Sequence, residues 1–144
     1  MQGIDITING KNITAEPGMT ILQAARANGI HIPTLCEHPA LENVGACRVC
    51  LVEVENSPKL LTSCTTPVAP GMVIHTHSPR VLKARKAVVE LILVRHPLDC
   101  FSCSSNGQCE LQDVAYELGI ESSSFADEGD TCRDYPLEDA NPFY

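Results

Sequence analysis

The sequence lacks long apolar segments and is poor in basic residues. It has no run of about 18 or more apolar residues, so no transmembrane helix and no direct membrane insertion are expected. Its first eleven residues lack the basic stretch and apolar segment of a secretory signal. Ten Lys and Arg stand against eighteen Asp and Glu, which gives a formal net charge of -8. This acidic balance argues against nucleic acid as the main partner.

Eight cysteines, by contrast, are present in only 144 residues. In a secreted chain they would usually pair as disulfides, whereas in a cytosolic chain they usually serve metal binding or redox chemistry. Because no secretory signal is visible, we expect a cytoplasmic protein of the second kind. The length suits one ordinary domain or two small ones.

The N-terminal part of the chain carries clear turn and cap signals. In residues 4–15 apolar and polar residues alternate on either side of Asn9-Gly10, which predicts a β-hairpin with a tight turn. Thr20 and Gln23 form a capping box, so a helix is predicted to begin there and to end at Asn28-Gly29.

Further strands are predicted after a long loop, residues 31–50, that is rich in Gly, Pro and Cys. They lie at residues 51–55, 60–63 and 72–75. Hairpin, helix and strands in this order predict a small α+β, grasp-like domain over residues 1–77.

The second part, residues 78–144, begins with a helix predicted from Ser78-Pro79 to about Arg95. Its apolar stripe is expected to face a core: Val81, Ala84, Ala87, Val88, Leu91 and Ile92. Its basic residues are expected on a solvent-exposed face: Arg80, Lys83, Arg85, Lys86 and Arg95. A Cys-rich loop and a helix over 110–118 follow. The acidic segment from residue 121 onward is weakly patterned, and we expect a partner to order it.

The cysteines and one histidine form two candidate ligand sets. The first is Cys36, Cys47, Cys50 and Cys64, with spacing C-x10-C-x2-C-x13-C; the second is His96, Cys100, Cys103 and Cys109, with spacing H-x3-C-x2-C-x5-C. Cys132 is left over as a plain free cysteine. Thiolates suit iron in clusters or zinc. Each set has one close pair and two scattered ligands, whereas zinc sites more often have two close pairs. The spacing therefore favours iron–sulfur clusters, keeps structural zinc as the alternative and puts a disulfide framework third.

The first set lies in a segment that resembles the [2Fe-2S] domain of the large iron–sulfur subunit of respiratory NADH–quinone oxidoreductase (complex I). The matching stretches are residues 32–36, 45–54 and 62–64. Ten residues separate Cys36 from Cys47, as in the complex I type, whereas plant-type ferredoxins have four. The resemblance implies a ubiquitin-like β-grasp fold and a [2Fe-2S] cluster held by Cys36, Cys47, Cys50 and Cys64.

The second set resembles the [4Fe-4S] segment of the same family, in which one histidine and three cysteines hold the cluster. The matching stretches are residues 96–100, Cys103 and 107–113. The resemblance implies that His96, Cys100, Cys103 and Cys109 bind a [4Fe-4S] cluster in a helical segment. A histidine in place of a thiolate makes such a cluster less negative, which should raise its reduction potential.

The same module occurs in NAD(P)-linked hydrogenases, including electron-bifurcating ones, and in NAD-dependent formate dehydrogenases. The resemblance therefore implies an electron relay in a hetero-oligomeric complex, between a flavin/NAD(P)-binding subunit and a hydrogenase, formate dehydrogenase or quinone-reducing subunit. No catalytic residue and no glycine-rich nucleotide motif is visible, so we expect no enzymatic activity from this chain alone. The alternative function is a zinc-binding adaptor without a redox role. In most relatives a stretch like residues 141–144 leads into a further cluster domain, expected here in a longer chain or on another subunit.

Overall fold

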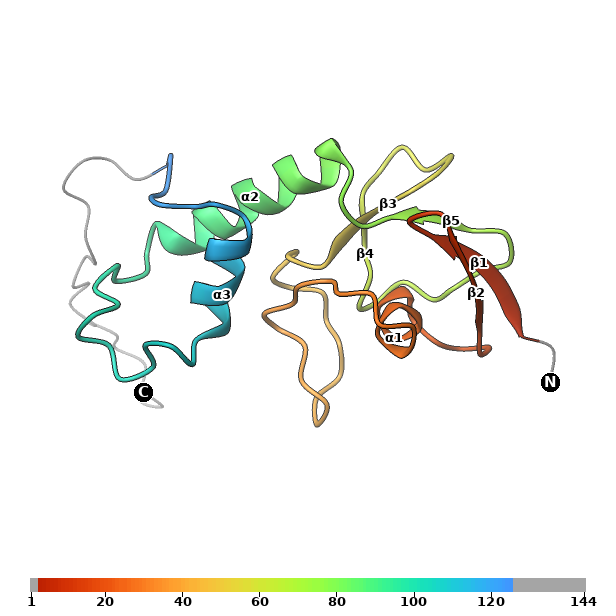
Figure 1. Cartoon of the computed structure of the whole chain (residues 1–144), viewed down its shortest axis with the longest axis horizontal. Helices are drawn as coiled ribbons and strands as arrows, with labels where there is room; N and C mark the ends of the chain where they lie inside the picture. Colours follow the sequence, from red (N-terminus) through yellow and green to blue (C-terminus); the bar gives the residue numbers. More distant parts are fainter. Residues whose placement is uncertain (1–2, 126–144) are drawn as a thin grey trace, which may run out of the picture.

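The computed structural model describes residues 3–125, which form a small sheet domain followed by two helices (Figure 1). The elements of the sheet domain are β1 (Ile4–Ile8), β2 (Lys11–Ala15), α1 (Ile21–Ala27), β3 (Leu51–Val54), β4 (Leu61–Thr62) and β5 (Val73–His75). The two later helices are α2 (Pro79–Leu93) and α3 (Glu110–Glu117). The predicted elements are all present, and their ends differ from the predicted ones by about one or two residues.

The sheet has five strands in the order β2-β1-β5-β3-β4. β1 pairs antiparallel with β2 and parallel with β5, while β3 pairs antiparallel with both β5 and β4. The turn of the hairpin has positive φ at Asn9 (51°) and Gly10 (80°), the conformation that favours these two residue types. This topology confirms the predicted α+β, grasp-like fold.

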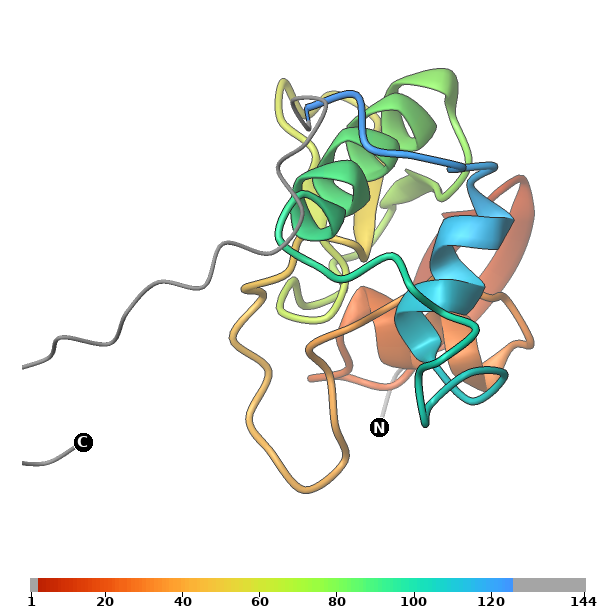
Figure 2. The same ribbon diagram turned by 90° about the vertical axis from the view of Figure 1, so that its left-hand side faces the viewer.

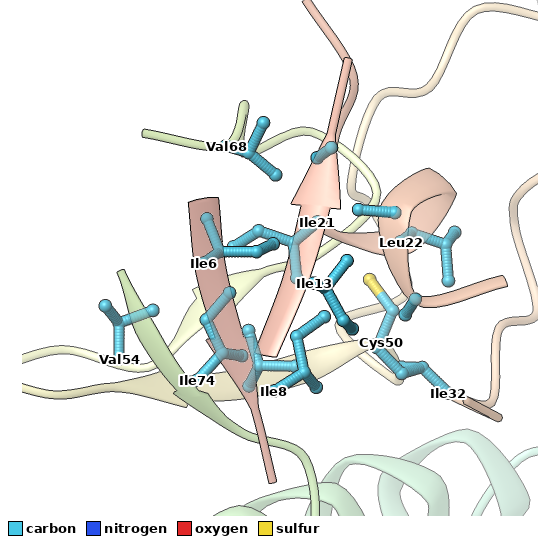
Figure 3. Close-up of a cluster of buried hydrophobic side chains, with 14 of the residues drawn as sticks. Ile6, Ile8, Ile13, Ile21, Leu22, Ile32, Cys50, Val54, Val68 and Ile74 are labelled. Atoms are coloured by element: carbon cyan, nitrogen blue, oxygen red, sulfur yellow. The ribbon is translucent and has the colours of Figure 1, made fainter. Parts of the chain in front are cut away.

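The main core lies between the sheet and α1, and Figure 3 shows its central side chains. Alternate residues of the hairpin, such as Ile6, Ile8 and Ile13, point into it because side chains alternate across a strand. Each fully buried isoleucine stabilises the fold by about 1.5–3 kcal/mol relative to exposure. Two cysteines, Cys50 and Cys64, are buried members of the same core.

The N-terminus of α1 is fixed both by its own cap and by a neighbouring segment. The Thr20 side chain accepts a hydrogen bond from the Gln23 backbone, and the Gln23 side chain accepts one from the Thr20 backbone, as the capping box predicts. The backbone N–H of Leu22 donates to the carbonyl of Ser63 at 3.0 Å. This bond attaches the residue before Cys64 to the helix.

A second core joins α2 and α3 to the loop before β3. Its buried members are Val49, Val89, Leu93, Val114, Ala115 and Ile120. The buried side of α2 is a row with a spacing of four: Val81, Arg85, Val89 and Leu93. The predicted apolar stripe was therefore partly wrong, since Leu91 is 56% exposed. The row is rotated relative to that stripe because α2 packs against β3 and α3 at once.

Residues 123 and 124, at the start of the acidic segment that we expected a partner to order, make hydrogen bonds with α2. Ser123 is buried and donates to the backbone carbonyl of Glu90 at 2.9 Å. The remainder of that segment, including Cys132, lies outside the described residues. Within residues 3–125, no helix has the length and apolarity required to cross a bilayer.

Candidate metal centres

The loop that carries the first three cysteines projects from the sheet domain between α1 and β3, in orange in both views (Figure 1, Figure 2). Its return toward the core needs left-handed backbone at Gly45 (φ 62°) and Arg48 (φ 60°). A Cβ at Gly45 would lie 3.3 Å from the Thr65 side chain, so both backbone conformation and space favour glycine there. Arg48, between the close cysteines, is exposed.

The structure brings the four thiols of the first set together as two pairs. The side chains of Cys36 and Cys47 are hydrogen-bonded to each other, and the backbone N–H of Cys47 also donates to Cys36 Sγ at 3.5 Å. The Sγ atoms of Cys50 and Cys64 lie 3.3 Å apart. A two-iron cluster takes two protein ligands on each iron, so two thiol pairs fit its donor set. All seven cysteines within residues 3–125 are free thiols.

The thiols of the first set influence one another's ionisation. Burial raises the pKa of Cys64 to about 12, together with the hydrogen bond to Cys50 and the charges of Cys50, Cys36 and Cys47. Burial also opposes ionisation of Cys47, but hydrogen bonds from Val49 and Cys36 outweigh it and leave the pKa of Cys47 below its usual value. Four thiolates this close together repel one another and need a positively charged metal centre. Metal binding therefore releases the thiol protons.

Buried side chains fix the backbone on both sides of Cys50. The Ser63 hydroxyl donates to the Cys50 carbonyl at 2.8 Å. Arg85 donates from Nε to the Val49 carbonyl and from Nη2 to the Leu51 carbonyl, each at 2.8 Å. These bonds hold the ligand segment against α2 and leave its thiol free to face Cys64.

Arg85 is the residue that the sequence analysis placed wrongly, on a solvent-exposed face. Its side chain is 0% exposed. Arg85 can be buried because three backbone carbonyls accept hydrogen bonds from its guanidinium, which offsets the cost of removing this polar group from water. The signal that could have revealed it is position, because Arg85 lies four residues after Val81 and four before Val89, both buried.

The second set lies on the loop between α2 and α3 and is more open. His96, Cys100, Cys103 and Cys109 line one small cavity, so all four predicted residues face a common space. His96 and Cys103 are exposed, whereas Cys100 and Cys109 are half-buried. Within residues 3–125, no three His, Cys, Asp or Glu side chains converge tightly enough for a single metal ion. A four-iron cluster places one ligand on each of four irons, so its donor set is wider than that of an ion.

Gln112 also lines this cavity and was not singled out from the sequence. Its amide oxygen accepts from the Gly107 backbone at 3.0 Å, and its amide nitrogen donates to Asn106 Oδ1 at 3.0 Å and to the Tyr116 hydroxyl at 3.2 Å. It therefore ties the loop between Cys103 and Cys109 to α3. The sequence offered one indication of this role, because Gln112 follows Cys109 by three residues, about one turn of the predicted helix.

The second core joins the first ligand loop to the two helices that border the second ligand loop. Leu35 and Cys47 of the first loop pack against the buried residues of α2 and α3, as does Leu111, two positions after Cys109. The two sites are thus connected through packed side chains.

Two family profiles match the chain, one for each half. The profile described as "2Fe-2S iron-sulfur cluster binding domain" matches residues 2–79. The profile described as "NADH-ubiquinone oxidoreductase-G iron-sulfur binding region" matches residues 85–124. Each matched region contains one complete candidate ligand set.

Individual relatives agree with the profiles. An NADH-quinone oxidoreductase subunit of Rickettsia bellii is 46% identical over 131 residues, which are 91% of this chain and 19% of the relative. The mitochondrial NADH-ubiquinone oxidoreductase 78 kDa subunit of Candida albicans is 44% identical over 122 residues, 85% of this chain and 17% of the relative. The chain therefore spans about a fifth of the length of these relatives.

A solved structure is also similar to this chain. A chain of the NAD+-reducing [NiFe]-hydrogenase, in a crystal structure of its H2-reduced state, superposes with a TM-score of 0.79 at 34% sequence identity. The match covers 85% of this chain and 52% of the hydrogenase chain.

Proposed function

The chain belongs to the family of iron–sulfur modules found in the large iron–sulfur subunit of complex I, and from this premise we propose that it relays electrons within an NAD(P)-linked oxidoreductase complex. Its cofactors are one [2Fe-2S] and one [4Fe-4S] cluster, as the two profiles indicate. The observation that carries the proposal is the pairing of four thiols at the first site, because two thiol pairs match a two-iron cluster.

The ligand assignment is part of this proposal. The [2Fe-2S] cluster is held by Cys36, Cys47, Cys50 and Cys64, and the [4Fe-4S] cluster by His96, Cys100, Cys103 and Cys109. When bound, the clusters supply reversible one-electron chemistry. We place the first site in a β-grasp domain, residues 1–77, and the second in a helical segment, residues 78–144. The second core packs the two parts together, which supports a rigid placement of one site relative to the other.

The chain's own residues bind the clusters and control their surroundings. Cys50 and Cys64 lie in the main core and exclude water from one side of the first cluster site. At the second site, His96 contributes a neutral ligand in place of a thiolate, which favours a higher reduction potential. The relay works without a substrate site, and we propose that this chain alone has no enzymatic activity.

The partners we propose are a flavin/NAD(P)-binding subunit on one side and a hydrogenase, formate dehydrogenase or quinone-reducing subunit on the other. The relatives named above are subunits of oxidoreductases, which supports a hetero-oligomeric complex. Leu98, Phe101 and Tyr116 are exposed and line one cavity together with Cys100, and such an apolar patch is typical of a surface that a partner covers. We propose a cytoplasmic location, which the free thiols support because a reducing compartment preserves them.

The first experiment measures cluster content. The chain, purified and reconstituted without oxygen, is expected to contain about six irons and six acid-labile sulfides. After chemical reduction with dithionite it is expected to show separate two-iron and four-iron signals in electron paramagnetic resonance (EPR). A colourless protein with about two zinc ions and no labile sulfide would instead identify a structural zinc adaptor.

The second experiment tests the relay. NADH is mixed with the loaded chain in a stopped-flow spectrometer, with and without a flavin-containing NADH-oxidising subunit. Rapid bleaching of the clusters is expected only when the flavin subunit is present. Bleaching by NADH with the loaded chain alone would contradict the assignment of a pure relay.

A further inference from the structure

Arg85 is a cation in an unusual position, completely buried beside the first ligand loop. It donates to the carbonyls of Val49 and Leu51, which flank Cys50, and Nη2 also donates to the Thr76 carbonyl at 3.2 Å. Nη1 is buried and has no hydrogen-bond partner within residues 3–125. Backbone carbonyls thus accept hydrogen bonds from Nε and Nη2, whereas Nη1 has no acceptor among the described residues.

Carbonyl partners satisfy hydrogen bonds but do not neutralise a charge. None of the ion pairs in the described part of the chain involves Arg85. A guanidinium remains protonated in proteins, so its positive charge is carried into the interior at a substantial desolvation cost. Burial lowers the pKa of Arg85, whereas the charges of Glu117 and Cys50 raise it. The hydrogen bonds to the two carbonyls that flank Cys50 place this charge beside the first ligand set.

An iron–sulfur centre at the first site would add negative charge to that of Glu117. A [2Fe-2S] cluster with four thiolates is anionic in both oxidation states, and reduction adds one more negative charge. Inside a protein a nearby fixed cation stabilises the more negative state, because the low dielectric weakens screening.

We propose that Arg85 is a positioning residue of the first cluster, which fixes the backbone around Cys50 and sets the reduction potential through its buried positive charge. This inference rests on the proposed [2Fe-2S] site at Cys36, Cys47, Cys50 and Cys64. It assigns to Arg85 both a mechanical and an electrostatic effect, and the two are separable by substitution.

The test is a redox titration of the loaded full chain, followed by the EPR signal of the two-iron cluster. Arg85→Met removes the charge and keeps an unbranched side chain. At a fixed solution potential it is expected to lower the ratio of reduced to oxidised cluster about tenfold, a shift of about 59 mV to more negative potential for one electron. Arg85→Lys keeps the charge, and its ratio of reduced to oxidised cluster is expected to stay within about twofold of the wild-type ratio.

The matched control is Lys83→Met, which removes a cation from the exposed side of the same helix. The ratio of reduced to oxidised cluster in this variant is expected to stay within about twofold of the wild-type ratio, because solvent and salt screen that charge. An Arg85→Met titration that coincides with the wild type would overturn the inference, provided that the wild type shows its normal two-iron signal. A wild type without that signal would instead contradict the proposed function.

A second pair of variants covers the case in which Arg85→Met does not hold the cluster. Arg85→Gln and Arg85→Lys both keep a hydrogen-bond donor and differ in charge. A difference of about tenfold between their reduced-to-oxidised ratios supports the electrostatic effect, and equal ratios refute it. Loss of the two-iron signal in Arg85→Lys as well would show that Arg85 acts only through backbone packing, and the proposed control of the potential would be wrong.

Discussion

The Sγ atoms of Cys50 and Cys64 lie 3.3 Å apart in the main core, although 14 positions separate the two residues in the chain. Ser63 links the two ligand segments, since its backbone N–H and its hydroxyl both donate to the Cys50 carbonyl. The β-grasp fold therefore brings the pair together, and it is the most buried part of the first site.

This pair gives the first prediction. Cys64→Ser is expected to abolish the two-iron EPR signal and to lower the iron content from about six to about four per chain, because one thiolate of a set of four is missing. The four-iron signal is expected to persist, since no residue of the second set is changed. Iron analysis and EPR of the same sample provide the measurement.

Cys132→Ser is the control for that experiment, and it is expected to retain both signals. Loss of either signal in Cys132→Ser would mean that the two ligand sets are wrongly assigned.

The fold was largely predictable because local signals and the global topology agree. Asn9-Gly10 fixes the hairpin turn, the Thr20 and Gln23 capping box starts α1, and Ser78-Pro79 starts α2, and all three appear as predicted. Each of these features depends only on residues a few positions apart. Local chemistry of this kind can be read from a sequence without knowing the tertiary structure.

Buried polar residues were not predictable in the same way. Arg85 is buried because carbonyls 34 and 36 positions earlier in the chain, at Leu51 and Val49, accept its hydrogen bonds. Glu90 is buried because Ser123 and Ser124 fold back onto it. In both cases the compensating partner comes from a distant segment, so helical periodicity alone assigns the residue to the solvent side.

His96 provides the second prediction. His96→Ala is expected to remove the four-iron EPR signal and to leave the two-iron signal, because the second set then holds only three ligands. His96→Cys is expected to keep a four-iron cluster with a more negative potential, since thiolate adds negative charge to the cluster. Redox titrations of the wild type and His96→Cys measure the difference.

His38→Ala is the matched control, because His38 lies beside the first set and accepts a backbone hydrogen bond from Ala40 within its own loop. Both signals are expected to survive in this variant. Unchanged four-iron signals in both His96→Ala and His38→Ala would exclude His96 as a ligand.

Gln112 gives the third prediction, through its two hydrogen bonds to the Cys103–Cys109 loop. Gln112→Ala is expected to accelerate loss of iron from the four-iron cluster to a chelator about fivefold, the factor that corresponds to about 1 kcal/mol for one net hydrogen bond. Gln108→Ala, on the exposed part of the same loop, is expected to leave this rate unchanged. Equal rates of iron loss for the two variants would contradict a holding role for Gln112.

The fourth prediction concerns Glu90 and Ser124, which attach the end of the described chain to α2. The Ser124 hydroxyl donates to the Glu90 carboxylate and holds the pKa of Glu90 below its usual value; the Ser124 backbone N–H and the charge of Lys86 act in the same direction, against burial. Because the folded-state pKa is lowered, this interaction stabilises the fold above the ordinary carboxyl pKa. The stabilisation is lost as pH falls through the lowered value.

Ser124→Ala is therefore expected to raise the pKa of Glu90 toward the ordinary value of 4.5, and NMR titration of isotope-labelled glutamate carboxyls measures this shift. Ser122→Ala changes an exposed neighbour and is expected to leave the pKa of Glu90 where it is. Ser124→Ala should also lower the free energy of unfolding more at pH 7 than near the folded-state pKa of Glu90. The reason is that protonation of Glu90 removes the charge that the hydroxyl stabilises. An unchanged pKa of Glu90 in Ser124→Ala would mean that the Ser124 hydroxyl is not the group that lowers it.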